Sequence, residues 1–137
     1  MKGYPKWFSK KLIQGLFWAL CSSGFILIPS MINTRLEWDV IWKLPSQLRI
    51  NIAALHALLS YLFSILLGVL FPIHIRLEWR KKRKRNTGVS ILIAIAFLII
   101  SGIGIYYISN DLLSLYSSLI HASIGLILMV IFLLHLC

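Results

Sequence analysis

Four long apolar runs constrain this chain more than any other feature of its sequence. Each reaches the length of about 20 helical residues that a hydrocarbon layer requires; they cover Leu12–Met31, Ile50–Ile75, Gly88–Ser109 and Leu112–Leu136. Of the 137 residues, 59% are hydrophobic, and a soluble domain of this size keeps too large an exposed area to hide so much apolar surface. The sequence therefore predicts an all-α membrane protein, an up-down-up-down bundle of four transmembrane helices that forms one domain over residues 1–137.

The first run could instead belong to a signal peptide, because four lysines precede it: Lys2, Lys6, Lys10 and Lys11. The run ends in Ile28-Pro29-Ser30-Met31, which lacks a small-x-small cleavage pattern. Leu20 is also too bulky to precede Cys21 at a lipoprotein cleavage site. An uncleaved first span is the favoured interpretation.

Basic residues are concentrated in two of the segments outside the apolar runs. Besides the four N-terminal lysines, seven lie between the second and third runs: Arg76, Arg80, Lys81, Lys82, Arg83, Lys84 and Arg85. The positive-inside rule therefore predicts a multi-pass protein of a bacterial-type cytoplasmic membrane, with both termini and the 76–87 loop in the cytoplasm. A basic cluster can also bind nucleic acid, but beside a membrane span it favours anionic membrane lipid as the partner, and no nucleic acid is expected.

The two outer connections differ in length. Residues 32–49 have the sequence INTRLEWDVIWKLPSQLR, in which Trp38 and Trp42 are four residues apart and would share one helix face. A short helix lying at the membrane interface is expected there. The other connection is short, and its Ser109-Asn110-Asp111 predicts a helix cap. We therefore expect two antiparallel helix pairs.

All four histidines fall in the second and fourth runs. In the predicted topology, His56 and His121 lie towards the outside, while His74 and His135 lie towards the cytoplasm. His56 and His74 are separated by about five helical turns, and the separation of His121 and His135 is about 40° short of four turns. Each helix therefore presents its histidines on one side, and we expect one cross-helix pair near each membrane face.

Paired imidazoles fit the two axial positions of a haem iron, because the porphyrin itself supplies the four equatorial nitrogens. Zinc, in contrast, usually takes four ligands from the protein. Haem b needs no CxxCH attachment motif, and the sequence has none. We expect two haems b, the outer one on His56 and His121 and the inner one on His74 and His135. A single outer haem, or histidines that only join helices, are the alternatives.

Charged and small residues complete the expected site. Cations suited to haem propionates are Lys43 and Arg49 outside, and Arg76 and Arg80 inside. Candidate proton carriers for a quinone reaction are Glu78 inside, and Glu37 and Asp39 outside, with an ordinary interfacial acid as the alternative for each. Gly102 and Gly104 in the third run would leave room for a large flat ligand.

Several short motifs in this chain also occur together in a known family. They are SGFILIPS at 23–30, Trp42, LHALL at 55–59 and HIRLEW at 74–79, and they extend over most of the chain. With them the chain resembles the small four-helix b-type cytochromes that serve as membrane subunits of formate dehydrogenases and nickel hydrogenases, and more closely their short relatives. Glu78 stands where that group usually has an amide or an imidazole. The resemblance implies a membrane-bound haem b protein built from four helices.

Iron with both axial positions filled does not bind substrate directly, so the expected haems would carry electrons one at a time. The leading hypothesis is a subunit of a respiratory or redox complex that moves electrons between the quinone pool and an extracytoplasmic redox protein or catalytic subunit, docked on the 32–49 connection. A stand-alone oxidoreductase that reacts quinone with superoxide is the second hypothesis, so whether the chain is itself an enzyme stays open. A haem-free structural or assembly subunit is the third.

Overall fold

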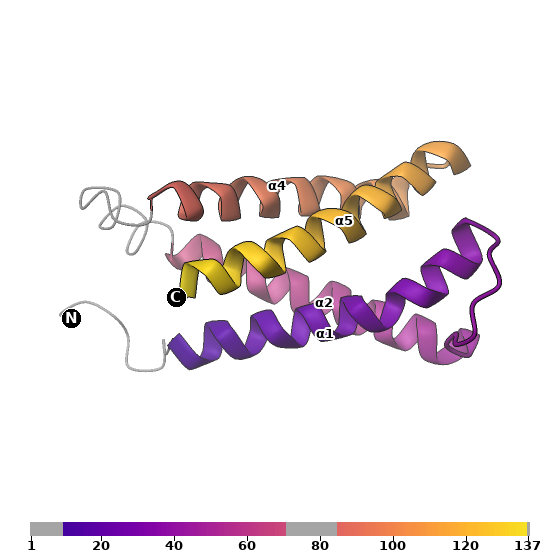
Figure 1. The fold of residues 1–137 in the computed structure, drawn as a ribbon, viewed down its shortest axis with the longest axis horizontal. Coiled ribbons are helices and arrows are strands. Elements are labelled where there is room, and N and C mark those ends of the chain that lie inside the picture. Colours follow the sequence, from indigo (N-terminus) through magenta and orange to yellow (C-terminus); the bar gives the residue numbers. More distant parts are fainter. Residues whose placement is uncertain (1–9, 71–84, 137) are drawn as a thin grey trace. The chain divides into compact units, whose positions relative to one another are not determined.

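The computed structural model describes residues 10–70 and 85–136, and these residues are almost entirely helical. The four helices are α1 (Lys10–Arg35), α2 (Ser46–Leu70), α4 (Arg85–Tyr107) and α5 (Asp111–Leu136), drawn in Figure 1. All four are long and apolar enough to cross a membrane. The predicted all-α fold with four transmembrane helices is confirmed, and the chain is a multi-pass membrane protein.

The chain divides into two compact units, each containing one helical hairpin. The first unit contains α1 as far as Ser30 together with residues 41–70, and the second contains residues 31–40 with α4 and α5. The predicted pairing of consecutive helices is therefore confirmed within each unit. The organisation of all four helices as one domain stays a prediction.

Phe17 forms the centre of the first hairpin. Its side chain is only 1% exposed, and its ring centroid lies 6.0 Å from that of Phe63 on α2. On its own helix, the Trp18 ring meets it edge-on at 5.8 Å. Because aromatic rings bury large apolar areas and attract one another in tilted arrangements, the contact of Phe17 with Phe63 holds α1 against α2.

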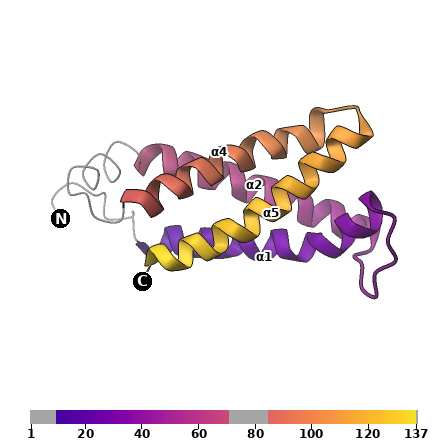
Figure 2. The same cartoon turned by 45° about the horizontal axis from the view of Figure 1, so that its top comes forward.

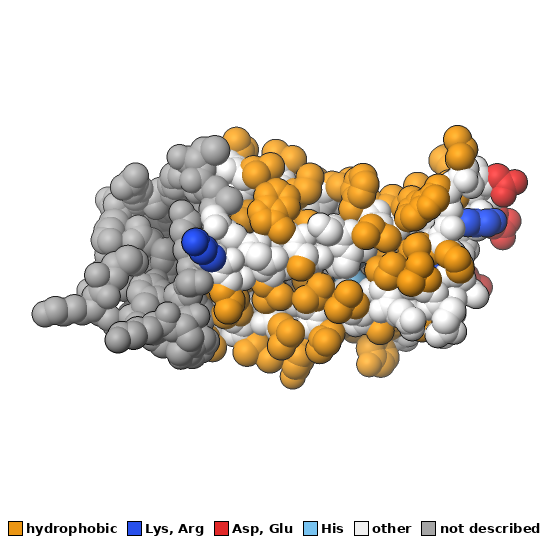
Figure 3. Space-filling model, turned by 90° about the horizontal axis from the view of Figure 1, so that it is seen from below, with side chains coloured by type: hydrophobic (Ala, Val, Ile, Leu, Met, Phe, Trp, Pro, Cys, Tyr) orange, Lys and Arg blue, Asp and Glu red, His pale blue; other side chains and the backbone are white. Residues whose placement is uncertain are grey.

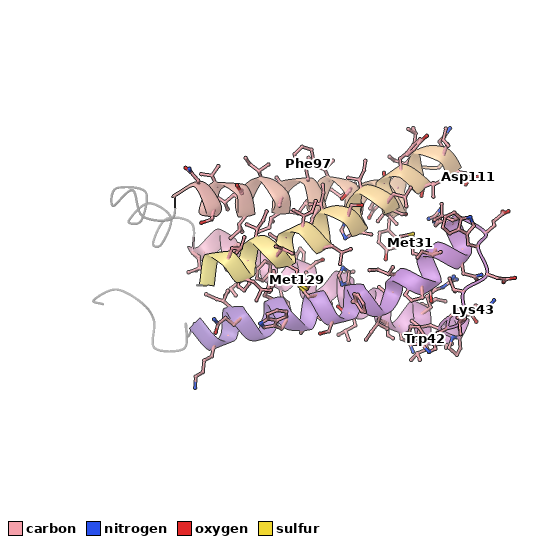
Figure 4. All side chains as sticks on the ribbon, viewed as in Figure 1. Met31, Trp42, Lys43, Phe97, Asp111 and Met129 are labelled. Atoms are coloured by element: carbon pink, nitrogen blue, oxygen red, sulfur yellow. The ribbon has the colours of Figure 1, made fainter. Side chains whose placement is uncertain are left out.

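The connection between α1 and α2 is irregular, so the prediction of an interfacial helix around Trp38 and Trp42 is wrong. The first helix continues to Arg35, and Glu37 then takes a left-handed conformation with φ of 56°, which ends the helix. Residues 36–45 contain no helix. Pro45 explains part of this result, because a proline disfavours helical geometry at the residue before it. Trp42 lies in this extended connection (Figure 4).

One hydrogen bond fixes the end of this connection to α1. The backbone N–H of Leu44 donates to Oγ of Ser30, 3.1 Å away. Ser30 is itself buried, with 3% of its surface exposed. This partly buried bond joins the connection to α1 just before α2 begins at Ser46.

In the second hairpin, α4 and α5 approach closely where their small residues meet. A Cβ atom added to Gly104 would lie 2.5 Å from Oγ of Ser117. The two helices converge towards their short connection in both Figure 1 and Figure 2. There Asn110 caps α5 as predicted, since its Oδ1 accepts the N–H of Leu113 at 3.0 Å.

The outer faces of the described helices are apolar. Many large hydrophobic side chains remain exposed, including Phe25, Ile100 and Tyr61 at 66–67%, and Phe97 projects away from α4 in Figure 4. On the face drawn in Figure 3, hydrophobic side chains cover the sides of the helices, and charged side chains are confined to their ends. Such a surface is suited to lipid rather than to water.

Candidate cofactor-binding histidines

His56 and His121 occupy equivalent places in their own hairpins. Each lies on the second helix of its pair, ten residues after the first residue of that helix, Ser46 in α2 and Asp111 in α5. Ten residues of α-helix rise about 15 Å, so each imidazole lies well inside its span. Both side chains are half-buried.

The imidazole of His56 is held against α1 by a serine and a glycine. Oγ of Ser23 lies 2.9 Å from Nδ1 of His56. A Cβ atom on the next residue, Gly24, would lie 3.0 Å from Cε1 and 3.6 Å from Nδ1 of the same ring. The ring therefore rests on helix backbone that only a glycine leaves uncovered.

The imidazole of His121 is held against α4 in the same way. Oγ of Ser101 lies 3.0 Å from Nδ1 of His121. A Cβ atom on Gly102 would lie 3.5 Å from Cε1 and 3.7 Å from Nδ1 of that ring. A Ser-Gly pair on the first helix thus contacts a histidine on the second helix in both hairpins.

Ser23 and Ser101 were not expected from the sequence to be partners of the histidines. A signal was present, because Ser-Gly occurs once in the first span and once in the third, at 23–24 and 101–102. Only the register of each hairpin shows that these pairs face a histidine. Both serines are buried, with 6% and 7% of their surfaces exposed.

Two glycines of α4, Gly102 and Gly104, lie against side chains of α5. Gly102 faces the ring of His121, and Gly104 faces Ser117. The expectation that these two glycines leave room for a large flat ligand stays a prediction. They allow a side chain of α5 to lie against the backbone of α4.

The other predicted site residues are distributed as follows. Lys43, Glu37 and Asp39 are exposed in the outer connection, and Arg49 is half-buried in the first turn of α2; Lys43 is labelled in Figure 4. The inner candidates His74, Arg76, Glu78 and Arg80 lie outside the described residues, as does the side chain of His135. The inner haem and the pairing of His56 with His121 across the two hairpins stay predictions.

Within the described residues, no group of three or more His, Cys, Asp or Glu side chains is placed to hold a metal ion. Comparison with known proteins found no matching family model, no similar curated protein and no similar solved structure. The function is therefore inferred from the two Ser-Gly-His arrangements and the membrane-spanning helices around them.

Proposed function

We propose that this chain is a di-haem b-type cytochrome that moves electrons across the membrane, between the quinone pool and an extracytoplasmic redox partner. The observation that carries the proposal is the repeated arrangement of the histidines. Each hairpin holds one imidazole, ten residues into its second helix, against a Ser-Gly pair on its first helix. Two imidazoles presented alike from two hairpins are the ligand set that a six-coordinate haem requires.

The residues around each histidine fit an axial ligand. A ligating imidazole usually has its second ring nitrogen hydrogen-bonded, which fixes the orientation of the ring. Ser23 and Ser101 are within hydrogen-bonding distance of that second nitrogen, Nδ1, in the two hairpins. Gly24 leaves space for the ring of His56, which a Cβ atom there would approach to 3.0 Å, and Gly102 lies beside the ring of His121. A histidine that merely faced lipid would need neither feature.

Each group of residues around the site has a proposed role. Haem b, when bound, supplies reversible one-electron transfer. The histidines hold and orient it, and the apolar helices exclude water from it. Lys43 and Arg49 lie at the outer end of the first hairpin and would bind the outer propionates. Glu37 and Asp39 outside, and Glu78 inside, are the candidates for moving protons to or from a quinone.

The outer connection is the proposed docking surface for the extracytoplasmic partner. Trp38 and Trp42 are 66% and 53% exposed there, and Ile41 between them is fully exposed. Exposed tryptophans are common anchors of protein interfaces. Under this proposal the chain is one subunit of a larger redox complex in a bacterial-type cytoplasmic membrane.

A haem-free structural subunit is the second candidate function. The Ser–His contacts favour it because they also join the two helices of each hairpin, as polar side chains do in membrane proteins. The two candidates differ in one measurable property, because only the first requires iron porphyrin.

The decisive experiment is the haem content of the purified full-length chain. The proposal predicts two haems b for each chain by pyridine extraction, and a reduced-minus-oxidised spectrum with the bands of a low-spin b-type cytochrome. A preparation made with sufficient haem that contains none would refute the cytochrome assignment and leave the structural subunit. If haem is present, co-purifying subunits support the electron-transfer complex, whereas reduction of quinone by superoxide with the isolated chain supports a stand-alone oxidoreductase.

A further inference from the structure

Ser101 has one hydroxyl proton and two kinds of neighbour, a ring nitrogen and backbone carbonyl oxygens, of which that of Leu98 lies 3.2 Å from Oγ. Its Oγ lies 2.7 Å from the backbone oxygen of Phe97 and 3.0 Å from Nδ1 of His121. The carbonyl oxygen can only accept a hydrogen bond. Both contacts are therefore satisfied in one arrangement alone, in which the serine donates to Phe97 and the imidazole donates its own proton from Nδ1 to Oγ.

Ser23 has the same two kinds of neighbour. Its Oγ lies 3.0 Å from the backbone oxygen of Leu20 and 2.9 Å from Nδ1 of His56. If the serine proton pointed at Nδ1, two accepting oxygens would face each other at 3.0 Å without a proton between them. The proton assignment that avoids this again places the imidazole proton on Nδ1.

We propose that Ser23 and Ser101 are positioning residues that hold the ring protons of His56 and His121 on Nδ1, so that Nε2 is the nitrogen each histidine offers to a ligand. A neutral imidazole carries one N–H and one lone pair, and fixing the proton on Nδ1 fixes the lone pair on Nε2. The two hairpins thus prepare the same tautomer independently of one another. The last step, that the ligand is haem iron, rests on the proposed function.

The burial of the two serines strengthens their control over the tautomer of each histidine. Both are buried within spans, where water cannot replace a missing hydrogen bond and an unsatisfied polar group is costly. In helices, a serine hydroxyl commonly donates a hydrogen bond to the backbone carbonyl three or four residues earlier. Here it has a consequence for the neighbouring helix, because it leaves the hydroxyl oxygen as an acceptor for the histidine.

The tautomer can be measured without haem. The full-length chain, with ¹⁵N-labelled histidine and expressed under haem limitation, is placed in phospholipid nanodiscs at a pH where the histidines are neutral. Nitrogen NMR then distinguishes a protonated from an unprotonated ring nitrogen, and signals are assigned by their loss in His56→Ala and His121→Ala. The expected result is a protonated Nδ1 and an unprotonated Nε2 at both residues. An unprotonated Nδ1 at either residue would overturn the inference for that hairpin.

Serine variants test the cause. Ser23→Ala should remove the uniform Nδ1–H signal of His56, and Ser101→Ala that of His121, each without affecting the other hairpin. Ser101→Thr keeps the hydroxyl and should keep the tautomer. Ser90→Ala is a matched control on α4, because Ser90 makes the same kind of backbone bond, to Asn86 at 3.0 Å. Unchanged spectra in both alanine variants would refute the role of the serines.

The haem-loaded protein provides a second readout. Loss of the hydrogen bond from Nδ1 makes a ligating imidazole a weaker donor to the metal, so the reduction potential of the outer haem should rise in Ser23→Ala and Ser101→Ala and stay constant in Ser90→Ala. A fixed potential in all three variants would contradict the inference. A chain that shows the Nδ1–H tautomer but takes up no haem would refute the proposed function and leave the serine assignment intact.

Discussion

The hydroxyl oxygen of Ser23 on α1 lies 2.9 Å from Nδ1 of His56 on α2. The same relationship recurs in the second hairpin, between Ser101 and His121 at 3.0 Å. In both cases the glycine that follows the serine lies beneath the ring. The orientation of each histidine therefore depends on the preceding helix of its own hairpin.

Replacing the outer histidines should remove one haem. His56→Ala and His121→Ala are each expected to halve the haem content of the chain, because one iron requires both ligands. The double variant should lose no more haem than either single variant, and pyridine extraction gives all three ratios. Ser60→Ala is the control on α2, since the hydroxyl of Ser60 donates to the backbone oxygen of Ala57, 2.8 Å away in its own helix. Additive losses would mean that the two histidines bind different haems.

The glycines beneath the two rings should respond differently to alanine. A methyl group at Gly24 would lie 3.0 Å from Cε1 of His56, so the ring must shift by a few tenths of an ångström. We expect Gly24→Ala to destabilise the chain by about 1–2 kcal/mol, as overpacking does, and to weaken the contact with Ser23. Thermal unfolding in detergent measures the effect.

Gly102→Ala and Gly68→Ala are the matched controls for this variant. A methyl group at Gly102 would make an ordinary contact at 3.5 Å, and one at Gly68 would meet nothing within 4 Å. Both should be neutral or stabilising by up to about 1 kcal/mol, because alanine is the better helix former. Equal destabilisation at all three glycines would show that space beside His56 is not the cause.

Gly104→Ala should loosen the contact between α4 and α5. The added methyl group would lie 2.5 Å from Oγ and 3.1 Å from Cβ of Ser117, so the helices must move apart, at a cost of about 1–3 kcal/mol. The double variant Gly104→Ala with Ser117→Gly exchanges the two volumes and should recover most of the lost thermal stability. Failure of the exchange to restore stability would place the origin of the effect elsewhere.

Glu37→Gly should stabilise the chain. Glu37 has a φ of 56°, and this left-handed conformation costs a residue with a Cβ about 1–2 kcal/mol relative to glycine. The expected rise in unfolding temperature is reduced by the greater freedom of glycine in the unfolded chain. Asp39→Gly is the control nearby, since Asp39 has no positive φ and gains nothing from the change. A larger gain at Asp39 than at Glu37 would contradict the reasoning.

Asn110→Ala should destabilise the first turn of α5. The side chain of Asn110 accepts the N–H of Leu113 at 3.0 Å, and loss of an N-cap costs about 0.5–2 kcal/mol. Asn110→Asp keeps the acceptor and should retain the stability. Amide hydrogen exchange at Leu113 reports the local effect, which should be fast in the alanine variant and slow in the aspartate variant.

The sequence was sufficient for the features that depend on local composition. Apolar length fixed the number of membrane-spanning helices, because a helix that crosses lipid must satisfy its own backbone and present apolar side chains all around. Asn110 was identifiable as a cap for the same kind of reason, since an N-cap bonds within its own helix turn. The predicted helix around Trp38 and Trp42 was wrong. The spacing of the two tryptophans favoured a helix, but the left-handed conformation of Glu37 and the presence of Pro45 disfavour one there.

The partners of the histidines were decided only by the tertiary structure. Ser23 and His56 are 33 residues apart, and Ser101 and His121 are 20 apart, so no local pattern joins them. Their contacts depend on the register of each hairpin, which is set by long-range packing such as that of Phe17 against Phe63 and of Gly104 against Ser117. Composition determines that these helices enter the membrane, whereas side-chain packing determines which residues of two neighbouring helices meet.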